Sequence, residues 1–210
     1  MVSRAALSIY ALKPRFQALL RPLVRRLFAA GITANQVTLF ACFGSVALGL
    51  WLFAAAPGAA AFAAMPVWMF LRMALNAIDG MLAREFGQKS ALGAFLNELG
   101  DVVSDAALVL PFATVAPFSP LWVGVVIWLG GVSEFAGVLG PAVGAARRYD
   151  GPLGKSDRAF VFGALGLWVA LGLPLPPWTA ALLPVLAALL VWTAVRRVML
   201  ALAQRSAATP

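Results

Sequence analysis

The 210-residue chain has no histidine, a single cysteine and few charged residues. The lack of histidine excludes imidazole as a metal ligand or as a catalytic base. The cysteine, Cys42, lies in an apolar stretch, so it forms no disulfide within the chain and is expected to pack as a small hydrophobic residue. Charged residues make up 11% of the chain, whereas a soluble domain carries about a quarter. This shortage excludes an ordinary soluble domain.

Hydrophobic residues, in contrast, make up 62% of the chain. They form six long stretches, at about 36–56, 60–84, 93–116, 121–145, 156–174 and 178–200. Each stretch approaches the roughly 20 residues that a helix needs to cross the hydrocarbon core of a membrane. We therefore predict an all-α integral membrane protein, with six transmembrane helices in one domain over residues 33–205.

The net charge of +8 is unevenly distributed along the chain. Three connections, at 56–58, 117–120 and 174–177, carry no charge, and the opposite ends of the stretches collect most basic residues: Arg21, Arg25, Arg26, Arg84, Lys89, Arg147, Arg148, Lys155, Arg158, Arg196, Arg197 and Arg205. The positive-inside rule places the basic side, with both termini, in the cytoplasm, which predicts an inner-membrane protein. Since topology and lipid headgroups account for the charge, no nucleic-acid partner is expected.

Residues 1–32, ahead of the first stretch, are predicted to contain an amphipathic helix. Basic and polar residues lie opposite an apolar stripe formed by Phe16, Leu19, Leu20, Leu23, Leu27 and Phe28. A helix of this kind lies in the membrane interface, with its arginines near anionic headgroups. We expect it on the cytoplasmic surface.

Acidic and amide side chains recur every three or four residues in the second and third apolar stretches. They are Asn76 and Asp79 in the second, and Asn97, Asp101 and Asp105 in the third. This spacing places them along one face of each helix. Carboxylates in a membrane-spanning segment are costly and usually mark a functional site. The two faces therefore form the candidate site, on the cytoplasmic side of the membrane.

Depth along the two helices pairs these residues by level. At about 1.5 Å per residue, Asp79 and Asn97 lie at one depth, and Asn76 and Asp101 lie deeper by about one turn. Each level offers a carboxylate and an amide oxygen, which are hard ligands suited to Mg²⁺, Mn²⁺ or Ca²⁺. We therefore predict that these four residues bind a metal. Glu98, about 100° from Asn97 around its helix, is either a substitute ligand or a charge at the rim.

The deepest level pairs Arg72 with Asp105, roughly 18 Å from the cytoplasmic helix ends. We predict a buried ion pair that closes the site. The alternative is that Arg72 extends to the interface and that Asp105 is a further metal ligand.

The motif Asp79-Gly80-x-x-Ala83-Arg84, followed after eight residues by Gly93 and then by Asp101, resembles the signature of the CDP-alcohol phosphatidyltransferases. That signature is D-x-x-D-G-x-x-A-R, about eight residues, and G-x-x-x-D-x-x-x-D. Residues 33–38, T-A-N-Q-V-T, are similar to the family's T-P-N-x-x-T. The resemblance implies transfer of a phosphatidyl group from CDP-diacylglycerol to a small polar alcohol, with release of CMP, in phospholipid biosynthesis. It also implies a homodimer.

The resemblance assigns roles to individual residues. Asp79 would be a metal ligand, and Asp101 would be the general base that takes the proton of the attacking hydroxyl. The residues expected at the CDP group are Asn35, Thr38, Gly80, Ala83, Arg84 and Gly93.

Two positions depart from the family signature, because Asn76 and Asn97 stand where the first and third aspartates are expected. An asparagine keeps a carbonyl oxygen but loses the charge, and metal affinity falls with ligand charge. We therefore expect one firmly bound Mg²⁺ or Mn²⁺, with a second ion uncertain. The alternative is a catalytically degenerate scaffold or lipid-binding protein that keeps the fold.

Residues 151–158, G-P-L-G-K-S-D-R, are similar to a G-K segment of several phosphatidyltransferases. A glycine-rich segment with a lysine at a helix start can bind phosphate. We predict that Lys155 and Arg158 bind the phosphate of an acceptor such as glycerol phosphate. The alternative is a basic loop that only sets the topology.

Glu134 is the one acid in the fourth apolar stretch. An acid inside a membrane segment usually faces a cavity or a partner. It is expected either to contact the acceptor or to pair with Arg72 in place of Asp105.

Overall fold

The computed structural model describes residues 13–208, and every regular element in this range is a helix. The α-helices are α1 (Lys13–Ala29), α2 (Ala34–Ala54), α3 (Ala64–Glu85), α4 (Ala91–Val109), α5 (Pro120–Val138), α6 (Lys155–Ala170) and α7 (Leu182–Ala208). Short 3₁₀-helices are η3 (Ala59–Ala63), η4 (Leu110–Thr114), η5 (Pro141–Val143) and η6 (Pro177–Ala181). The all-α prediction is confirmed. Residues 1–12 of the predicted interfacial segment lie outside the described range.

Side-chain caps fix the starts of the two helices that frame the candidate site. The Thr33 hydroxyl accepts a hydrogen bond from the backbone N–H of Gln36, whose side chain accepts one from Thr33 N–H in return. This reciprocal capping box begins α2. Ser90 begins α4, since its hydroxyl accepts the N–H of Gly93 at 2.9 Å. Both helices therefore enter the bundle at defined residues.

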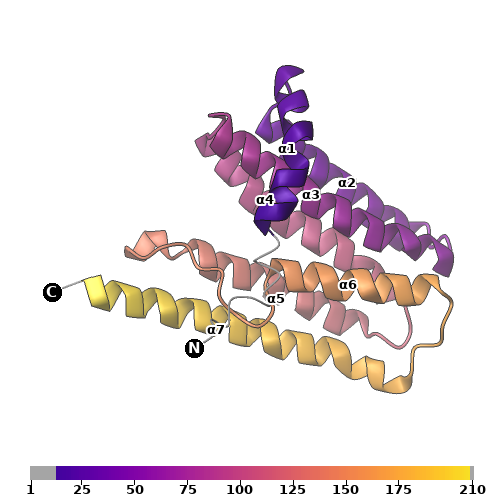
Figure 1. Ribbon diagram of the computed structural model, residues 1–210. Helices are drawn as coiled ribbons and strands as arrows, with labels where there is room; N and C mark the ends of the chain where they lie inside the picture. Colours follow the sequence, from indigo (N-terminus) through magenta and orange to yellow (C-terminus); the bar gives the residue numbers. More distant parts are fainter. Residues whose placement is uncertain (1–12, 209–210) are drawn as a thin grey trace, which may run out of the picture.

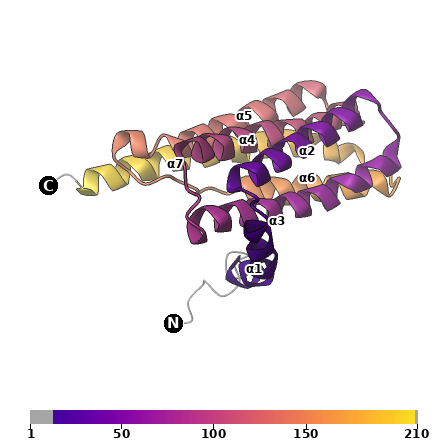
Figure 2. The same ribbon diagram turned by 90° about the horizontal axis from the view of Figure 1, so that it is seen from above.

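The helices form two groups joined at the centre of the molecule (Figure 1). In the first group, α2 packs against both α3 and α4, and in the second, α5 packs along α7. The helix α6 packs against α3, and α4 contacts α5, so the two groups share a common interior. The helix α1 packs against α3 and projects away from the other helices (Figure 2). Five helices, α3 to α7, thus border the interior.

Apolar side chains fill two separate clusters. The larger one is centred on Phe112. Its ring makes edge or tilted contacts with the rings of Phe62, Phe118 and Phe162. The smaller one attaches α1 to α3 through Val24, which is fully buried against Ile78, Met81 and Leu82. Val24 was not part of the apolar stripe predicted for this helix.

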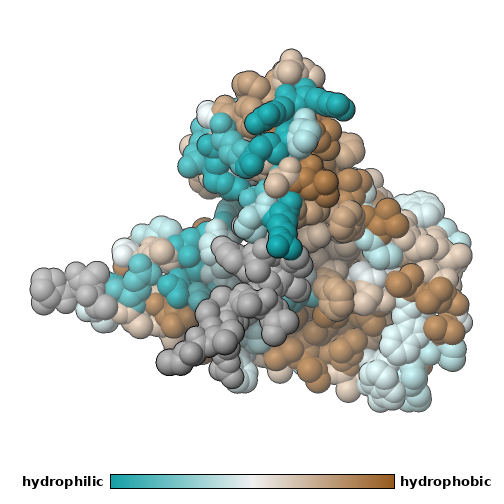
Figure 3. Space-filling model, in the orientation of Figure 1, coloured by the Kyte–Doolittle hydropathy of each residue, from teal (hydrophilic) through white to brown (hydrophobic). Residues whose placement is uncertain are grey.

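Large apolar side chains also cover the outside of the helices. More than half exposed are Phe40, Phe43, Phe70, Phe95, Phe135 and Phe160. The hydrophilic residues gather instead over α1, the end of α3 and the C-terminal part of α7, at the top and left of Figure 3. A surface divided in this way suits helices whose flanks contact lipid.

Four helical segments of the described chain are long and apolar enough to cross a membrane: Ala34–Ala54, Ala59–Glu85, Pro120–Val138 and Pro177–Ser206. They correspond to the first, second, fourth and sixth predicted spans. The third predicted span, α4, carries Glu98, Asp101 and Asp105, and the fifth, α6, has only 16 residues. Six crossings therefore stay a prediction.

The fourth helix ends earlier than the predicted span at 121–145. Its last residue is Val138, and Pro141 then begins the short helix η5. Proline has no N–H to continue the hydrogen-bond ladder. The carbonyl of Gly137 is instead bonded by the N–H of Arg148 at 3.1 Å, because the following loop folds back onto α5. A side chain at Gly137 would meet the Arg148 carbonyl at 2.5 Å, so this return needs glycine.

Candidate functional site

The predicted faces of α3 and α4 meet in the structure. The Asn76 amide lies 3.5 Å from the Asp101 carboxylate, as expected for the second level. At the third level, Arg72 contacts Asp105 at 2.5 Å, which confirms the predicted ion pair. Arg72 also reaches the Asp101 carboxylate at 3.3 Å. The two deeper levels are thus found as predicted.

At the first level, Asp79 takes a partner from α2. Asp79 is 5% exposed, and its carboxylate accepts a hydrogen bond from the Thr38 hydroxyl at 2.8 Å. Thr38 was predicted to border the CDP group, and the structure places it where it orients Asp79. The half-buried Asn97, on α4, has no hydrogen bond among the described residues. Asp79 and Asp101 lie close enough for their charges to interact.

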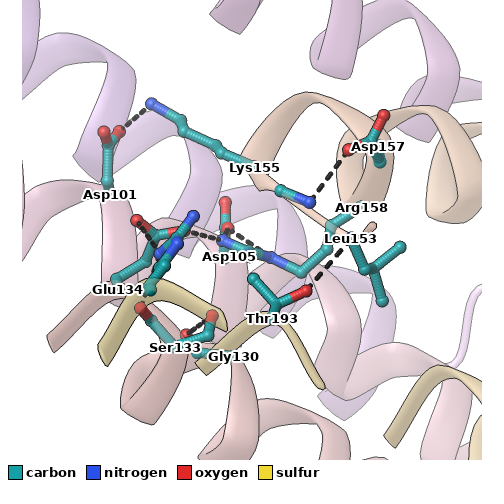
Figure 4. Close-up of polar contacts among 12 residues, drawn as sticks. Asp101, Asp105, Gly130, Ser133, Glu134, Leu153, Lys155, Asp157, Arg158 and Thr193 are labelled. Atoms are coloured by element: carbon teal, nitrogen blue, oxygen red, sulfur yellow. Dashed lines mark hydrogen bonds and ion pairs between the residues drawn. The ribbon is translucent and has the colours of Figure 1, made fainter. Parts of the chain in front are cut away.

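Lys155, the first residue of α6, forms an ion pair with Asp101 (Figure 4). Both side chains remain partly exposed, Lys155 at 30% and Asp101 at 18%. Lys155 was predicted to bind phosphate, and its contact with Asp101 was not predicted. Asp101 is therefore held by residues from α3 and α6, and it stays open to the surface.

Ion pairs continue from Asp101 into the interior. Asp105 binds Arg158 as well as Arg72, and Arg158 also binds Glu134, at 2.7 and 2.9 Å respectively (Figure 4). Glu134 in turn contacts Arg197 at 3.2 Å. The result is a row of alternating charges, here called the ion-pair chain: Lys155, Asp101, Arg72, Asp105, Arg158, Glu134 and Arg197. It links α3, α4, α5, α6 and α7.

The ion-pair chain contains two residues for which the sequence predicted other contacts. Glu134 does not replace Asp105 as the partner of Arg72, because its carboxylate bonds Arg158 and Arg197. Arg158, predicted to bind an acceptor phosphate, is only 5% exposed and already contacts two carboxylates.

Sequence reasoning missed Arg197, which lies beside Arg196 and was interpreted as part of the basic cytoplasmic end. Arg197 is 1% exposed and donates to the Ser133 carbonyl at 2.5 Å and to the Asp150 carbonyl at 3.1 Å. The position of Arg197 around the helix could have indicated its burial, because Leu190, Thr193 and Arg197 all lie on the buried face of α7. Arg197 thereby ties the 144–154 loop, which leads into Lys155, to the interior.

Glycines allow side chains to lie close to the backbone at the opening of the site. The Arg84 guanidinium folds over Gly80, where a Cβ would come within 2.6 Å of it. The Asn35 side chain lies against Gly93, at 2.7 Å from the place of a Cβ. Arg84 is exposed, and Ala83 is half-buried beside it. Among the residues expected at the CDP group, Asn35 of α2 and Gly93 of α4 are thus in contact, as are Gly80 and Arg84 of α3.

Two further ion pairs form the rim. Glu98, left open as a ligand or a rim charge, pairs with Arg147, and Arg148 pairs with Asp150 at 2.9 Å. The Arg147 guanidinium also lies 4.6 Å from the centre of the Tyr149 ring. These contacts attach the 144–154 loop to the end of α4.

Residues 31–203 match the CDP-alcohol phosphatidyltransferase family. The chain belongs to this family. It is thus a phosphatidyltransferase of the membrane, as the sequence resemblance implied.

Relatives of this phosphatidyltransferase include the inner membrane protein YnbA of Escherichia coli (strain K12). That protein is 44% identical over 191 residues, which cover 91% of this chain and 94% of YnbA. The phosphatidylinositol phosphate synthase of Mycobacterium tuberculosis H37Rv is 29% identical over 172 residues, or 80% of this chain and 76% of that enzyme. The apolar helices and these relatives make the chain an integral membrane protein.

Two crystal structures of the Mycobacterium tuberculosis phosphatidylinositol phosphate synthase PgsA1 have a similar fold. One is a complex with manganese and citrate, and the other has CDP-DAG bound. Each superposes on this chain with a TM-score of 0.70 at 24% sequence identity. Both matches cover 86% of this chain; they cover 87% of the crystal chain in the manganese and citrate complex and 92% of it in the complex with CDP-DAG. At this identity they establish the shared fold.

The donor set of this phosphatidyltransferase fits a divalent cation. Within residues 13–208, no three acidic or cysteine side chains gather around a common point. Asp79 and Asp101 supply two carboxylates, and Asn76 and Asn97 supply neutral amide oxygens, which are acceptable to hard cations. A second dication would require negative charge that the two asparagines lack.

Proposed function

We propose that the enzyme transfers the phosphatidyl group of CDP-diacylglycerol to the hydroxyl of a small polar alcohol and releases CMP. The observation that carries the proposal is the contact of Asn76 with Asp101 across α3 and α4, with the buried Asp79 one turn from Asn76 on the same face of α3. The PgsA1 structure with CDP-DAG bound supports the donor, and the structure with manganese supports a divalent ion.

The proposed reaction is a displacement at the β-phosphorus of the donor. The acceptor oxygen forms a bond to this phosphorus, the bond to the oxygen bridging the two phosphates breaks, and its electron pair leaves with CMP. Asp101 takes the hydroxyl proton as the general base, because it is partly exposed whereas Asp79 is buried. Lys155 and Arg72 fix the direction of the Asp101 carboxylate.

Asp79 and Asp101, with Asn76 and Asn97, would hold one Mg²⁺ or Mn²⁺. Such an ion neutralises the diphosphate and the charge that develops on the departing phosphate. Thr38 orients Asp79 for this role. Arg84 lies at the opening and can turn from Gly80 toward the diphosphate, with Asn35, Ala83 and Gly93 bordering the nucleotide.

We further propose that α2 to α7 all cross the inner membrane, with both termini and the site on the cytoplasmic side. The acids of α4 do not oppose this arrangement, because each is ion-paired within the protein. The opposite face of α4 exposes Phe95, Leu99 and Val103. Residues 33–205 would form the catalytic domain, and residues 1–32 the interfacial segment, where Leu19 and Leu23 of α1 are exposed. Homodimer formation stays a prediction.

The proposal is tested with purified protein in lipid vesicles containing CDP-diacylglycerol. A panel of alcohols is supplied with Mn²⁺ or Mg²⁺, and CMP release and the lipid product are measured by chromatography and mass spectrometry. We expect release that requires both an alcohol and a divalent ion, and a loss of at least about 100-fold in Asp79→Ala and Asp101→Asn. Gly124→Ala, near the start of α5 and with no atom within 4 Å of the added Cβ, serves as the control. CDP-diacylglycerol binding without CMP release under any condition would support the lipid-binding alternative instead.

A further inference from the structure

We propose that the acceptor is an alcohol without a phosphate group. This inference rests on the proposed function and names the class of its second substrate. The basic residues around Asp101 are Arg72, Arg147, Lys155 and Arg158, and each forms an ion pair with a carboxylate of the chain. None of the four offers an uncompensated positive charge to a dianionic phosphate.

Arg158 is the most firmly committed of these cations. Its Nε and one terminal nitrogen bond Asp105, and the same terminal nitrogen bonds Glu134. The other terminal nitrogen has no hydrogen-bond partner in the described chain. The cavity beside Arg158 measures about 20 Å³ and is lined mostly by apolar side chains such as Val126 and Ile127. Since that volume holds about one water molecule, this cavity has no room for a phosphate beside the guanidinium.

The rim cations are committed in the same way. Arg147 lies between the Glu98 carboxylate and the Tyr149 ring, and Arg148 bonds Asp150. A phosphate that approached from the cytoplasm would have to displace a carboxylate that is already in place. Such a substitution gains little, because the displaced acid remains nearby and repels the phosphate.

The charge balance of the whole site leads to the same conclusion. The ion-pair chain and the rim contain six cations, and with Asp79 they contain six carboxylates. One divalent ion and Arg84 then face the two charges of the donor diphosphate, which leaves at most one unit of positive charge for a second dianion. An uncharged hydroxyl compound needs no such compensation. The oxygens of Asn97, Glu98 and Asp101 are instead hydrogen-bond acceptors suited to hydroxyl groups.

The test compares acceptors in matched pairs, each with and without a phosphate: glycerol and glycerol 3-phosphate, inositol and inositol 1-phosphate, serine and phosphoserine. We expect kcat/KM for CMP release to be at least about tenfold higher with the unphosphorylated member of the best pair. Inorganic phosphate at millimolar concentration should not compete with that alcohol. Equal or better use of the phosphorylated member overturns the inference while leaving the proposed function intact, whereas no CMP release with any alcohol contradicts both.

A charge-neutralising variant makes the test independent of the natural preference. Glu98→Gln frees Arg147 from its carboxylate and should lower KM for the phosphorylated acceptor by about threefold or more, and it should not lower KM for the unphosphorylated one, because the glutamine loses one acceptor oxygen for a hydroxyl. Gly124→Ala, near the start of α5 and with no atom within 4 Å of the added Cβ, is the control and should change neither KM. If both variants shift the two acceptors alike, the paired rim charges do not set the preference, and the inference fails.

Discussion

Asp105 should contribute more to stability than its predicted pairing with Arg72 alone would suggest. Its carboxylate accepts hydrogen bonds from two guanidinium groups, at 2.5 Å from Arg72 and at 2.7 and 3.2 Å from Arg158. In Asp105→Leu, two buried cations would face each other without the acid between them. The double variant Arg72→Met/Asp105→Leu removes one of these cations and leaves Arg158 with Glu134 as its partner.

The expected sizes follow from the contacts. Opposite charges about 4 Å apart attract by about 4 kcal/mol at an effective dielectric constant of about 20. Asp105 has two such partners, but its removal from water costs several kcal/mol, so the net loss for a broken buried pair is about 3–5 kcal/mol. We expect Asp105→Leu to lower the free energy of unfolding by about 4 kcal/mol, and the double variant by about 2 kcal/mol, because Arg158 then loses one of its two carboxylate partners and keeps Glu134.

The measurement is reversible unfolding in mixed detergent micelles, followed by tryptophan fluorescence. Val103→Ala, at a half-exposed position of α4, is the control and should stay close to wild type. A double variant as unstable as Asp105→Leu would refute the pairing with Arg72. A double variant as stable as the wild type would refute the contribution of Arg158 and leave an isolated pair.

Three further predictions concern the metal and the helix packing. Thr38→Val removes the hydroxyl that bonds Asp79 and should weaken Mn²⁺ binding by about tenfold, as measured by electron paramagnetic resonance; unchanged affinity would contradict the positioning role. Gly49→Ala places a Cβ 2.1 Å from the Ala107 carbonyl of α4 and should cost about 1–3 kcal/mol, whereas Gly124→Ala, with no atom within 4 Å, should not lower the melting temperature. Chelation of divalent ions should abolish CMP release reversibly, and release that persists would contradict metal dependence.

The residues that could be placed from the sequence lie on neighbouring helices with a short connection. A period of three to four residues defines one face of a helix, and α3 and α4, which are joined by a short turn, both pack against α2. That is why the contacts of Asn76 with Asp101 and of Arg72 with Asp105 were predictable.

The rest of the ion-pair chain joins segments far apart in the sequence, and no local pattern indicates which cation meets which acid. Lys155 and Arg197 both occur in basic stretches that the positive-inside rule explains equally well. Arg197 differs from its neighbour Arg196 only in helical phase, and its burial depends on α5 lying against α7. The end of α5 was also missed, because the apolar sequence continues past the residue where Pro141 interrupts the hydrogen-bond ladder.

The shortness of α6 has a consequence for the surrounding lipid. Its 16 residues measure about 24 Å, roughly 6 Å less than the hydrocarbon thickness of a bilayer. A transmembrane helix that is too short makes the adjacent leaflet thinner. The helix α6 begins at Lys155, which pairs with Asp101 in the middle of α4. With α6 crossing the membrane as proposed, the leaflet next to its Lys155 end should be locally thin and hydrated. At this place a polar alcohol from water could reach the diphosphate of a lipid donor while the acyl chains of the donor stay in the bilayer.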